Sequence, residues 1–86
     1  MKIIVDQNIR GAEGTFGQHS DLQFMEGRLI SAVDVKDADV LIIRTATRVD
    51  QSLLEGSSVR FVGTTSIGTD HLDIDWLDSN GITWSN

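Results

Sequence analysis

The sequence predicts an α/β fold in which an open, parallel β-sheet carries helices on both faces. Two observations lead to this prediction: short, β-branched apolar runs recur along the chain, and stretches with helix-capping residues separate them. The length of 86 residues allows one small hydrophobic core, so we interpret residues 1–86 as a single domain.

Five segments have the pattern of strands. Residues 3–5 and 40–43 are continuously apolar, which is typical of central strands that are buried on both faces, and residues 61–62 continue this pattern. Residues 21–24 and 82–85 alternate polar with apolar side chains. Such alternation is typical of flanking strands with one polar face.

The clearest helix is expected near the end of the chain. Asp70 provides an N-cap, and Leu72, Trp76 and Leu77 form an apolar stripe at helical spacing. Gly81 follows, as is common just beyond the end of a helix. The pattern therefore predicts a helix that begins at Asp70.

Three shorter helices are expected between the other strands. One follows Asp50 and ends at Gly56, and another follows Ser31, whose hydroxyl forms a capping pattern with Asp34 three residues later. Residues 11–17 contain three glycines, each of which costs about 1 kcal/mol relative to alanine inside a helix. We expect a short, frayed helix there.

Alternating strands and helices imply parallel strands joined by right-handed crossovers. The expected arrangement is a flavodoxin-like sheet with strand order 2-1-3-4-5. Ligands of such sheets bind beyond the carboxyl ends of the strands, which correspond here to residues 6–8, 44–47 and 63–68. Candidate functional residues are therefore sought in these three segments.

The charge balance excludes two classes of partner. Thirteen acidic residues against seven Lys and Arg give a formal net charge of −6, which repels nucleic acid and anionic membrane surfaces. No apolar run approaches the length of a membrane span, which is roughly 18 residues. With no cysteine to indicate an oxidising compartment, the cytoplasm is the expected location.

Residues 44–48 form a loop suited to anions. Arg44 offers a planar set of donors for carboxylate or phosphate, Thr45 and Thr47 add hydroxyl groups, and Arg48 adds a second cation. The alternative is that Arg48 is solvated and that Thr47 only satisfies the loop backbone. On these residues alone both interpretations remain open.

Residues 63–70 form a second candidate loop, rich in small and hydroxyl-bearing side chains that include Ser66. Gly63 and Gly68 would allow a ligand to approach the main chain, whose N–H groups could face an anion. The loop lacks the ending of a Walker A motif, so it does not predict a nucleotide site. The alternative is an ordinary turn whose glycines serve conformation only.

Other polar residues give weaker signals. His71 lies among acids and is most simply a surface or capping residue, with an acid–base or metal role as the alternative. Asp6 and Asn8 fit a turn or a minor wall of a site. The glycines of residues 11–17 do not have the spacing of a dinucleotide fingerprint, so no cofactor-binding residue is predicted.

Three segments, residues 2–8, 38–49 and 61–73, together resemble the opening of D-2-hydroxyacid dehydrogenases, and the Gly-Thr-x-x-x-Gly-Thr-Asp-His stretch is the most specific part of this resemblance. The resemblance implies the first part of a substrate-binding domain from an NAD-dependent enzyme that oxidises a small phosphorylated 2-hydroxy acid and forms a homodimer. It further implies that no catalytic, NAD-binding or metal-binding residue lies in this chain, which alone would be inactive.

The resemblance also implies which residues contact the substrate. Thr45 and Ser66 correspond to hydroxyl-bearing positions that bind it. Arg44, Ile67 and Gly68 correspond to the surrounding loops, where backbone N–H groups receive the substrate carboxylate.

Two other interpretations of the chain are considered. A stand-alone flavodoxin-like interaction or signalling module would have the same fold, but a phospho-receiver would have an aspartate where Arg44 and Thr45 stand. An unstable, truncated chain is the other, because an open sheet without its second half exposes apolar surface.

Overall fold

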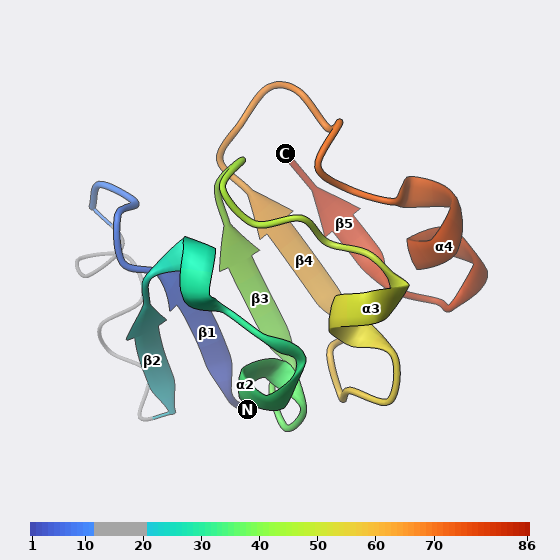
Figure 1. The fold of residues 1–86 in the computed structure, drawn as a ribbon, viewed down its shortest axis with the longest axis horizontal. Helices are drawn as coiled ribbons and strands as arrows, with labels where there is room; N and C mark the ends of the chain where they lie inside the picture. The colour runs from blue at the N-terminus through green and yellow to red at the C-terminus, as the bar shows by residue number, and fades with distance from the viewer. Residues whose placement is uncertain (12–20) are drawn as a thin grey trace.

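The computed structural model describes residues 1–11 and 21–86, which form a five-stranded, parallel sheet (Figure 1). The strands are β1 (Ile3–Asp6), β2 (Leu22–Met25), β3 (Val40–Ile43), β4 (Phe61–Thr64) and β5 (Thr83–Ser85). Their order is β2-β1-β3-β4-β5, and each neighbouring pair is parallel. The predicted α/β class, strand order and five strands are confirmed.

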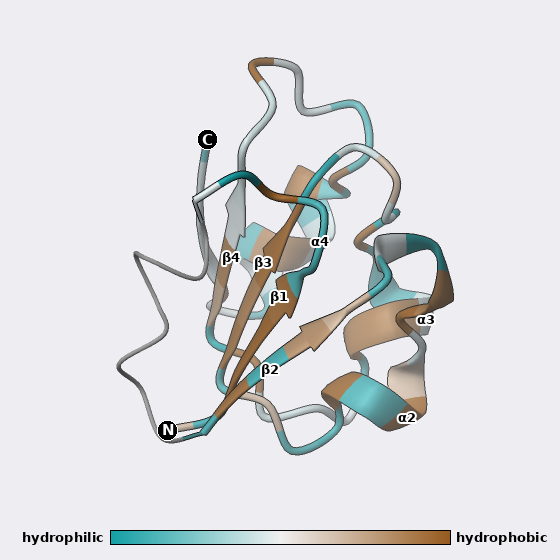
Figure 2. Ribbon diagram, turned by 90° about the vertical axis from the view of Figure 1, so that its left-hand side faces the viewer, coloured by the Kyte–Doolittle hydropathy of each residue, from teal (hydrophilic) through white to brown (hydrophobic). Residues whose placement is uncertain are grey.

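Short helical segments connect the strands: η1 (Gly27–Leu29), α2 (Ala32–Val35), α3 (Gln51–Leu54) and α4 (Ile74–Ser79). Figure 2 shows α2, α3 and α4 on the same side of the sheet. The helix expected over residues 11–17 lies, beyond Gly11, outside the described residues, so a helix on the second face stays a prediction. Within residues 1–11 and 21–86, no helix combines the length and apolar character needed to cross a bilayer.

Two predicted caps are confirmed. The backbone N–H and the hydroxyl of Ser31 both donate to the Asp34 carboxylate at 2.9 Å, which fixes the start of α2. The Asp50 carboxylate accepts a hydrogen bond from the Leu53 N–H at 3.2 Å and caps α3. Gly56, with a φ of +78°, reverses the chain after this helix, where a side chain would be strained.

The start of α4 differs from the prediction. The cap is Asp73 rather than Asp70, and its carboxylate accepts a hydrogen bond from the third residue of the helix at 3.2 Å. The preceding residue, Leu72, instead pairs with Val49 in an isolated parallel bridge. The Val49 N–H donates to the His71 carbonyl and the Asp73 N–H to the Val49 carbonyl, each at 2.8 Å, so this stretch is extended.

The core has two parts, one on each face of the sheet. The larger part lies between the sheet and the helices, where Ile4, Leu41 and Val62 contact Leu54 and Leu77. The smaller part contains the buried Ile3 and Val5, against which half-buried side chains of β2 and β3 pack. Apolar burial on both faces of β1 explains why residues 3–5 are continuously apolar.

Two buried glycines lie in tightly packed positions. At Gly27 a Cβ atom would overlap the Asp6 carboxylate and lie 3.2 Å from the Thr47 hydroxyl. At Gly63, within β4, a Cβ atom would lie 2.9 Å from the end of the Ile42 side chain. The expectation that Gly63 admits a ligand is therefore wrong, since this residue is buried inside the sheet.

We expect Gly27→Ala to destabilise the protein by about 1–3 kcal/mol, the usual cost of overpacking. The Asp6 carboxylate that the new methyl group meets is held in place by hydrogen bonds and cannot move aside. Gly63→Ala is the matched control, because the Ile42 side chain can rotate away. Urea denaturation of both variants measures the difference, and a larger loss for Gly63→Ala would contradict this account.

Candidate functional site

The loops that follow β3 and β4 meet at the carboxyl edge of the sheet. Ile43 and Thr64 are paired in the parallel register, and the Thr65 N–H donates to the Ile43 carbonyl at 3.2 Å. Thr45 and Ser66 each follow their strand by two residues, so they emerge at the same edge. The structure therefore brings the two loops together as the sequence predicts.

These loops border an open hollow on the surface, with a volume of about 410 Å³. Its lining residues are Thr45, Arg48, Gly68, Asp70 and His71. A Cβ atom at Gly68 would meet nothing within 4 Å, so the main chain there is open to a ligand. Of the five predicted substrate-binding residues, Thr45 and Gly68 line the hollow itself.

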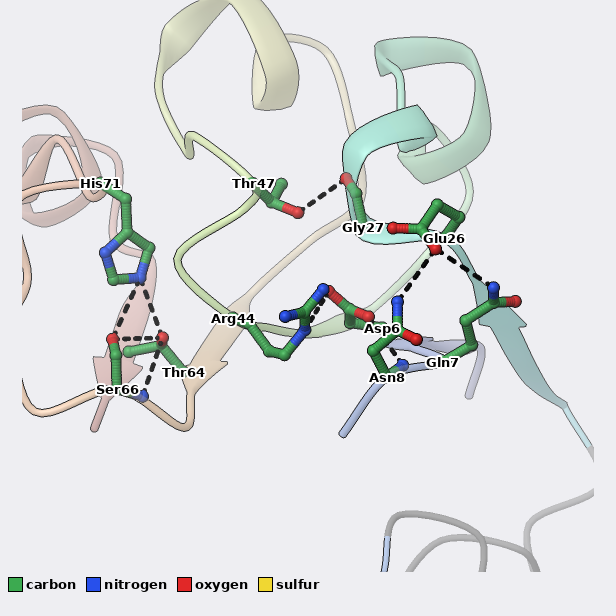
Figure 3. A network of polar contacts seen from close by, with 10 residues as sticks. All are labelled: Asp6, Gln7, Asn8, Glu26, Gly27, Arg44, Thr47, Thr64, Ser66 and His71. Carbon is green, nitrogen blue, oxygen red and sulfur yellow. Dashed lines mark hydrogen bonds and ion pairs between the residues drawn. The ribbon is translucent and has the colours of Figure 1, made fainter. Parts of the chain in front are cut away.

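Arg44 is held by a buried acid (Figure 3). Its Nε donates to the Asp6 carboxylate at 3.0 Å, and the Asp6 side chain is fully buried whereas that of Arg44 is 33% exposed. The other carboxylate oxygen of Asp6 accepts the Asn8 N–H at 2.9 Å. Asp6 therefore fixes the guanidinium through Nε, and the other guanidinium nitrogens make no hydrogen bond within the described residues.

The other two polar residues of the β3 loop have structural partners. The Thr47 hydroxyl is buried and donates to the Gly27 carbonyl at 2.8 Å, which ties the loop to η1. Arg48 is 70% exposed, and its Nε lies 3.3 Å from the Asp50 carboxylate. Thr47 therefore satisfies the backbone of η1 rather than that of its own loop, while Arg48 is exposed beside Asp50 and lines the hollow.

His71 is buried, which corrects the expectation of a surface or capping residue. Its Nε2 lies 2.9 Å from the Thr64 hydroxyl and 3.5 Å from the Ser66 hydroxyl. The residue reaches this position because the bridge to Val49 holds the chain extended beside it. No local pattern in the sequence indicates this contact, since it depends on the path of the whole loop.

Burial lowers the pKa of the His71 imidazole below its ordinary value of 6.5, because a cation is poorly solvated there. The neighbouring Asp70 carboxylate opposes this shift. Burial is the larger effect, so the imidazole is neutral at pH 7.

Backbone donors are available in the β4 loop. Within the described residues, the N–H groups of Ile67, Gly68 and Thr69 make no hydrogen bond. The Ile67 side chain is 95% exposed, so only the backbone of this residue can contribute to an anion site. Three consecutive free amides beside a hydroxyl are suited to bind a carboxylate or a phosphate.

An acidic side chain lies near β1 at the same edge of the sheet. The Glu26 carboxylate accepts hydrogen bonds from the Asn8 and Gln7 side-chain amides at 2.9 and 3.3 Å. The hydrogen bond from Asn8 is the main cause that lowers the pKa of Glu26, so this group is anionic at pH 7. A negative ligand is therefore favoured near β4 and disfavoured near β1.

Comparison with known proteins identifies the family that this chain resembles. A model of the D-isomer specific 2-hydroxyacid dehydrogenase catalytic domain matches residues 3–86. The chain is 51% identical over all 86 residues to the erythronate-4-phosphate dehydrogenase of Pseudomonas entomophila and covers 22% of that protein. It is 52% identical over 85 residues to the same enzyme of Baumannia cicadellinicola, covering 99% of this chain and 23% of the relative.

Solved structures show the same fold at low sequence identity. The D-lactate dehydrogenase of Aquifex aeolicus, complexed with NAD and lactic acid, superposes with a TM-score of 0.82 at 16% identity. The match covers 98% of this chain and 27% of that one. An acyclic imino acid reductase in complex with NADPH and D-Arg gives a TM-score of 0.79 at 18% identity, covering 100% and 30% of the two chains.

The ion pair of Asp6 and Arg44 should show strong coupling in unfolding experiments. Arg44→Met leaves a buried carboxylate without its cation, and we expect it to cost about 3–5 kcal/mol. The double variant Asp6→Asn, Arg44→Met removes both charges and should recover most of that loss. Urea denaturation measures all three proteins, and a double variant no more stable than Arg44→Met would contradict this account.

The lowered pKa of His71 predicts a pH dependence of stability. The unfolded chain binds this proton more readily than the folded chain, so the stabilisation is complete above the ordinary pKa of 6.5 and decreases as the pH falls below it. We expect the urea midpoint to fall more between pH 7.5 and 5.5 in the native protein than in His71→Gln. Equal changes in both proteins would show that His71 does not carry this dependence.

Proposed function

The chain belongs to the D-isomer specific 2-hydroxyacid dehydrogenase family, and from this membership we propose that it forms the substrate side of a 4-phosphoerythronate dehydrogenase. The whole protein would oxidise the 2-hydroxyl group of 4-phospho-D-erythronate to a 2-oxo acid, with NAD as the oxidant. The chain spans 22–24% of the length of its curated relatives, so this activity is proposed for the whole protein. The identity of about half of all residues to enzymes of that name supports this substrate over other hydroxy acids.

One structural observation carries the proposal. The hydroxyl-bearing Thr45 and Ser66 follow paired strands, and the free amides of Ile67 and Gly68 lie in the same loop as Ser66. This edge combines hydroxyl groups for a polyhydroxy chain with N–H donors for a carboxylate. Arg44, fixed by Asp6, supplies a cation at the same edge and suits the acid or the phosphate.

The contribution of these residues to the reaction would be orientation. When C2 of the substrate is held in one position, the reacting groups are already oriented for reaction, which lowers the entropic part of the activation barrier. Although the chain is acidic overall, charges more than about 8–10 Å away are screened at physiological salt, so the nearby amides and Arg44 determine anion affinity.

We propose NAD binding for the whole protein and not for the described residues. Gly63, the first glycine of the β4 loop stretch, is packed inside the sheet, and the glycines of the chain lack the spacing of the dinucleotide fingerprint. We therefore assign no NAD-binding residue in this chain. A homodimer and a cytoplasmic location stay proposals for the whole protein.

The test is an assay of the whole protein with NAD and 4-phospho-D-erythronate, in which NADH formation is measured. We expect turnover with this substrate and little with D-lactate, which lacks the phosphate. Thr45→Val should raise the KM for 4-phospho-D-erythronate about tenfold, because a hydrogen bond to a charged ligand contributes roughly 1.5 kcal/mol.

Thr83→Val is the matched control, since Thr83 is an exposed threonine in β5, at the amino end of that strand. It should leave KM unchanged. Absence of turnover in the whole protein would refute the proposed activity, whereas an equal KM in the two variants would refute the role of Thr45.

A further inference from the structure

Three polar side chains, His71, Thr64 and Ser66, contact one another at the carboxyl edge of the sheet. The His71 Nε2 lies 2.9 Å from the Thr64 hydroxyl, which lies 3.0 Å from the Ser66 hydroxyl. The Ser66 hydroxyl in turn lies 2.8 Å from the Gly68 carbonyl (Figure 3 shows the three side chains). Thr64 and His71 are buried, while Ser66 is half-buried at the edge.

The direction of these hydrogen bonds follows from the last one. A carbonyl oxygen can only accept, so the single hydroxyl proton of Ser66 is donated to Gly68. The contact between Thr64 and Ser66 then requires Thr64 to donate. Because Thr64 donates its only hydroxyl proton to Ser66, its oxygen can only accept a hydrogen bond from His71. The Nε2 atom of His71 must therefore carry a hydrogen.

The opposite arrangement leaves an unfavourable contact. If Thr64 donated to an unprotonated Nε2, the hydroxyl oxygens of Thr64 and Ser66 would lie 3.0 Å apart with no hydrogen between them. In the first arrangement the Thr64 oxygen donates once and accepts twice, from His71 and weakly from the Ser66 N–H at 3.5 Å. This uses its full hydrogen-bonding capacity.

We propose that His71 is a positioning residue that, through Thr64, fixes the Ser66 hydroxyl as a hydrogen-bond acceptor toward the bound ligand. This inference rests on the proposed function for the identity of the ligand. Because the Ser66 proton is donated to Gly68, the Ser66 oxygen can offer a ligand only a lone pair, beside its weak contact of 3.5 Å with the His71 Nε2. A hydroxyl group of the substrate can donate to it, whereas a carboxylate or carbonyl oxygen would meet another oxygen.

The burial of His71 supports a neutral imidazole in this role, because burial lowers its pKa. A neutral imidazole has two tautomers, and the polar contacts select the one with hydrogen on Nε2. In the described residues, every side-chain nitrogen or oxygen that is fully buried has a hydrogen-bond partner. The Nδ1 atom of His71 has no hydrogen-bond partner there, so this atom must be accessible to solvent. Water can therefore satisfy its lone pair.

The first experiment measures the tautomer directly. Long-range proton–nitrogen NMR spectra of the ¹⁵N-labelled native protein at pH 7.5 distinguish the two neutral forms of histidine. The chain has a second histidine, His19, so the signal of His71 is assigned by its loss in His71→Gln. We expect the Nε2–H form, and finding the Nδ1–H form would overturn the proposal.

The second experiment separates a positioning role from a merely structural one. We expect His71→Leu, which has no donor, to raise the KM for 4-phospho-D-erythronate about tenfold, the effect of roughly 1.4 kcal/mol. His71→Gln, whose side-chain amide can donate to Thr64, should restore KM to within about threefold of the native value. Equal KM values in the two variants would contradict the proposal.

The outcomes distinguish this inference from the proposed function. Binding of 4-phospho-D-erythronate together with the Nδ1–H tautomer would refute the role of His71 and leave the function standing. The Nε2–H tautomer without any binding would refute the function and support the hydrogen-bond chain. If His71→Leu does not fold, Thr64→Val removes the hydroxyl group that donates to Ser66 and should raise KM similarly, and an unchanged KM would overturn the proposal.

Discussion

The carboxyl edge of the sheet is organised around the fully buried carboxylate of Asp6. A charge at the end of a completely buried strand is tolerated only if cations and N–H donors surround it. Arg44 and the Asn8 N–H provide these partners, and Gly27 lacks a side chain because the carboxylate occupies the space. The ends of β1 and β3 and the start of η1 are therefore fixed relative to one another by one charged group.

The edge consists of two clusters with different chemistry. Near β1, charges dominate: Asp6 and Arg44 are paired, and Glu26 remains anionic. Near β4, neutral donors and acceptors dominate, namely the hydroxyl groups and the free amides of the loop. A ligand that carries both an acid group and hydroxyl groups matches the β4 cluster, because its acid group can face the loop amides while its hydroxyl groups face Thr45 and Ser66, away from the anionic Glu26.

Local patterns predicted most of the fold and only part of the site. The five strands and the caps at Ser31 and Asp50 follow from hydrophobic periodicity and from capping chemistry, which act over a few residues, and the strand order follows from the crossover rules for alternating strands and helices. The burial of His71 and the partner of Asp6 could not be predicted, because both depend on residues distant in sequence. The start of α4 was misplaced for the same reason: pairing with Val49 keeps the chain extended where Asp70 suggests a helix.

The pairing of Val49 with Leu72 has a consequence for how this edge can vary. The pairing of β3 with β4 joins the two loops at one end, and this bridge joins them at the other. The backbones of the two loops therefore form a closed ring. An insertion or deletion on one side would strain the other unless both changed length together. Natural variation in substrate range should therefore arise from exchanges of side chains in these two loops, while the lengths of the loops stay constant.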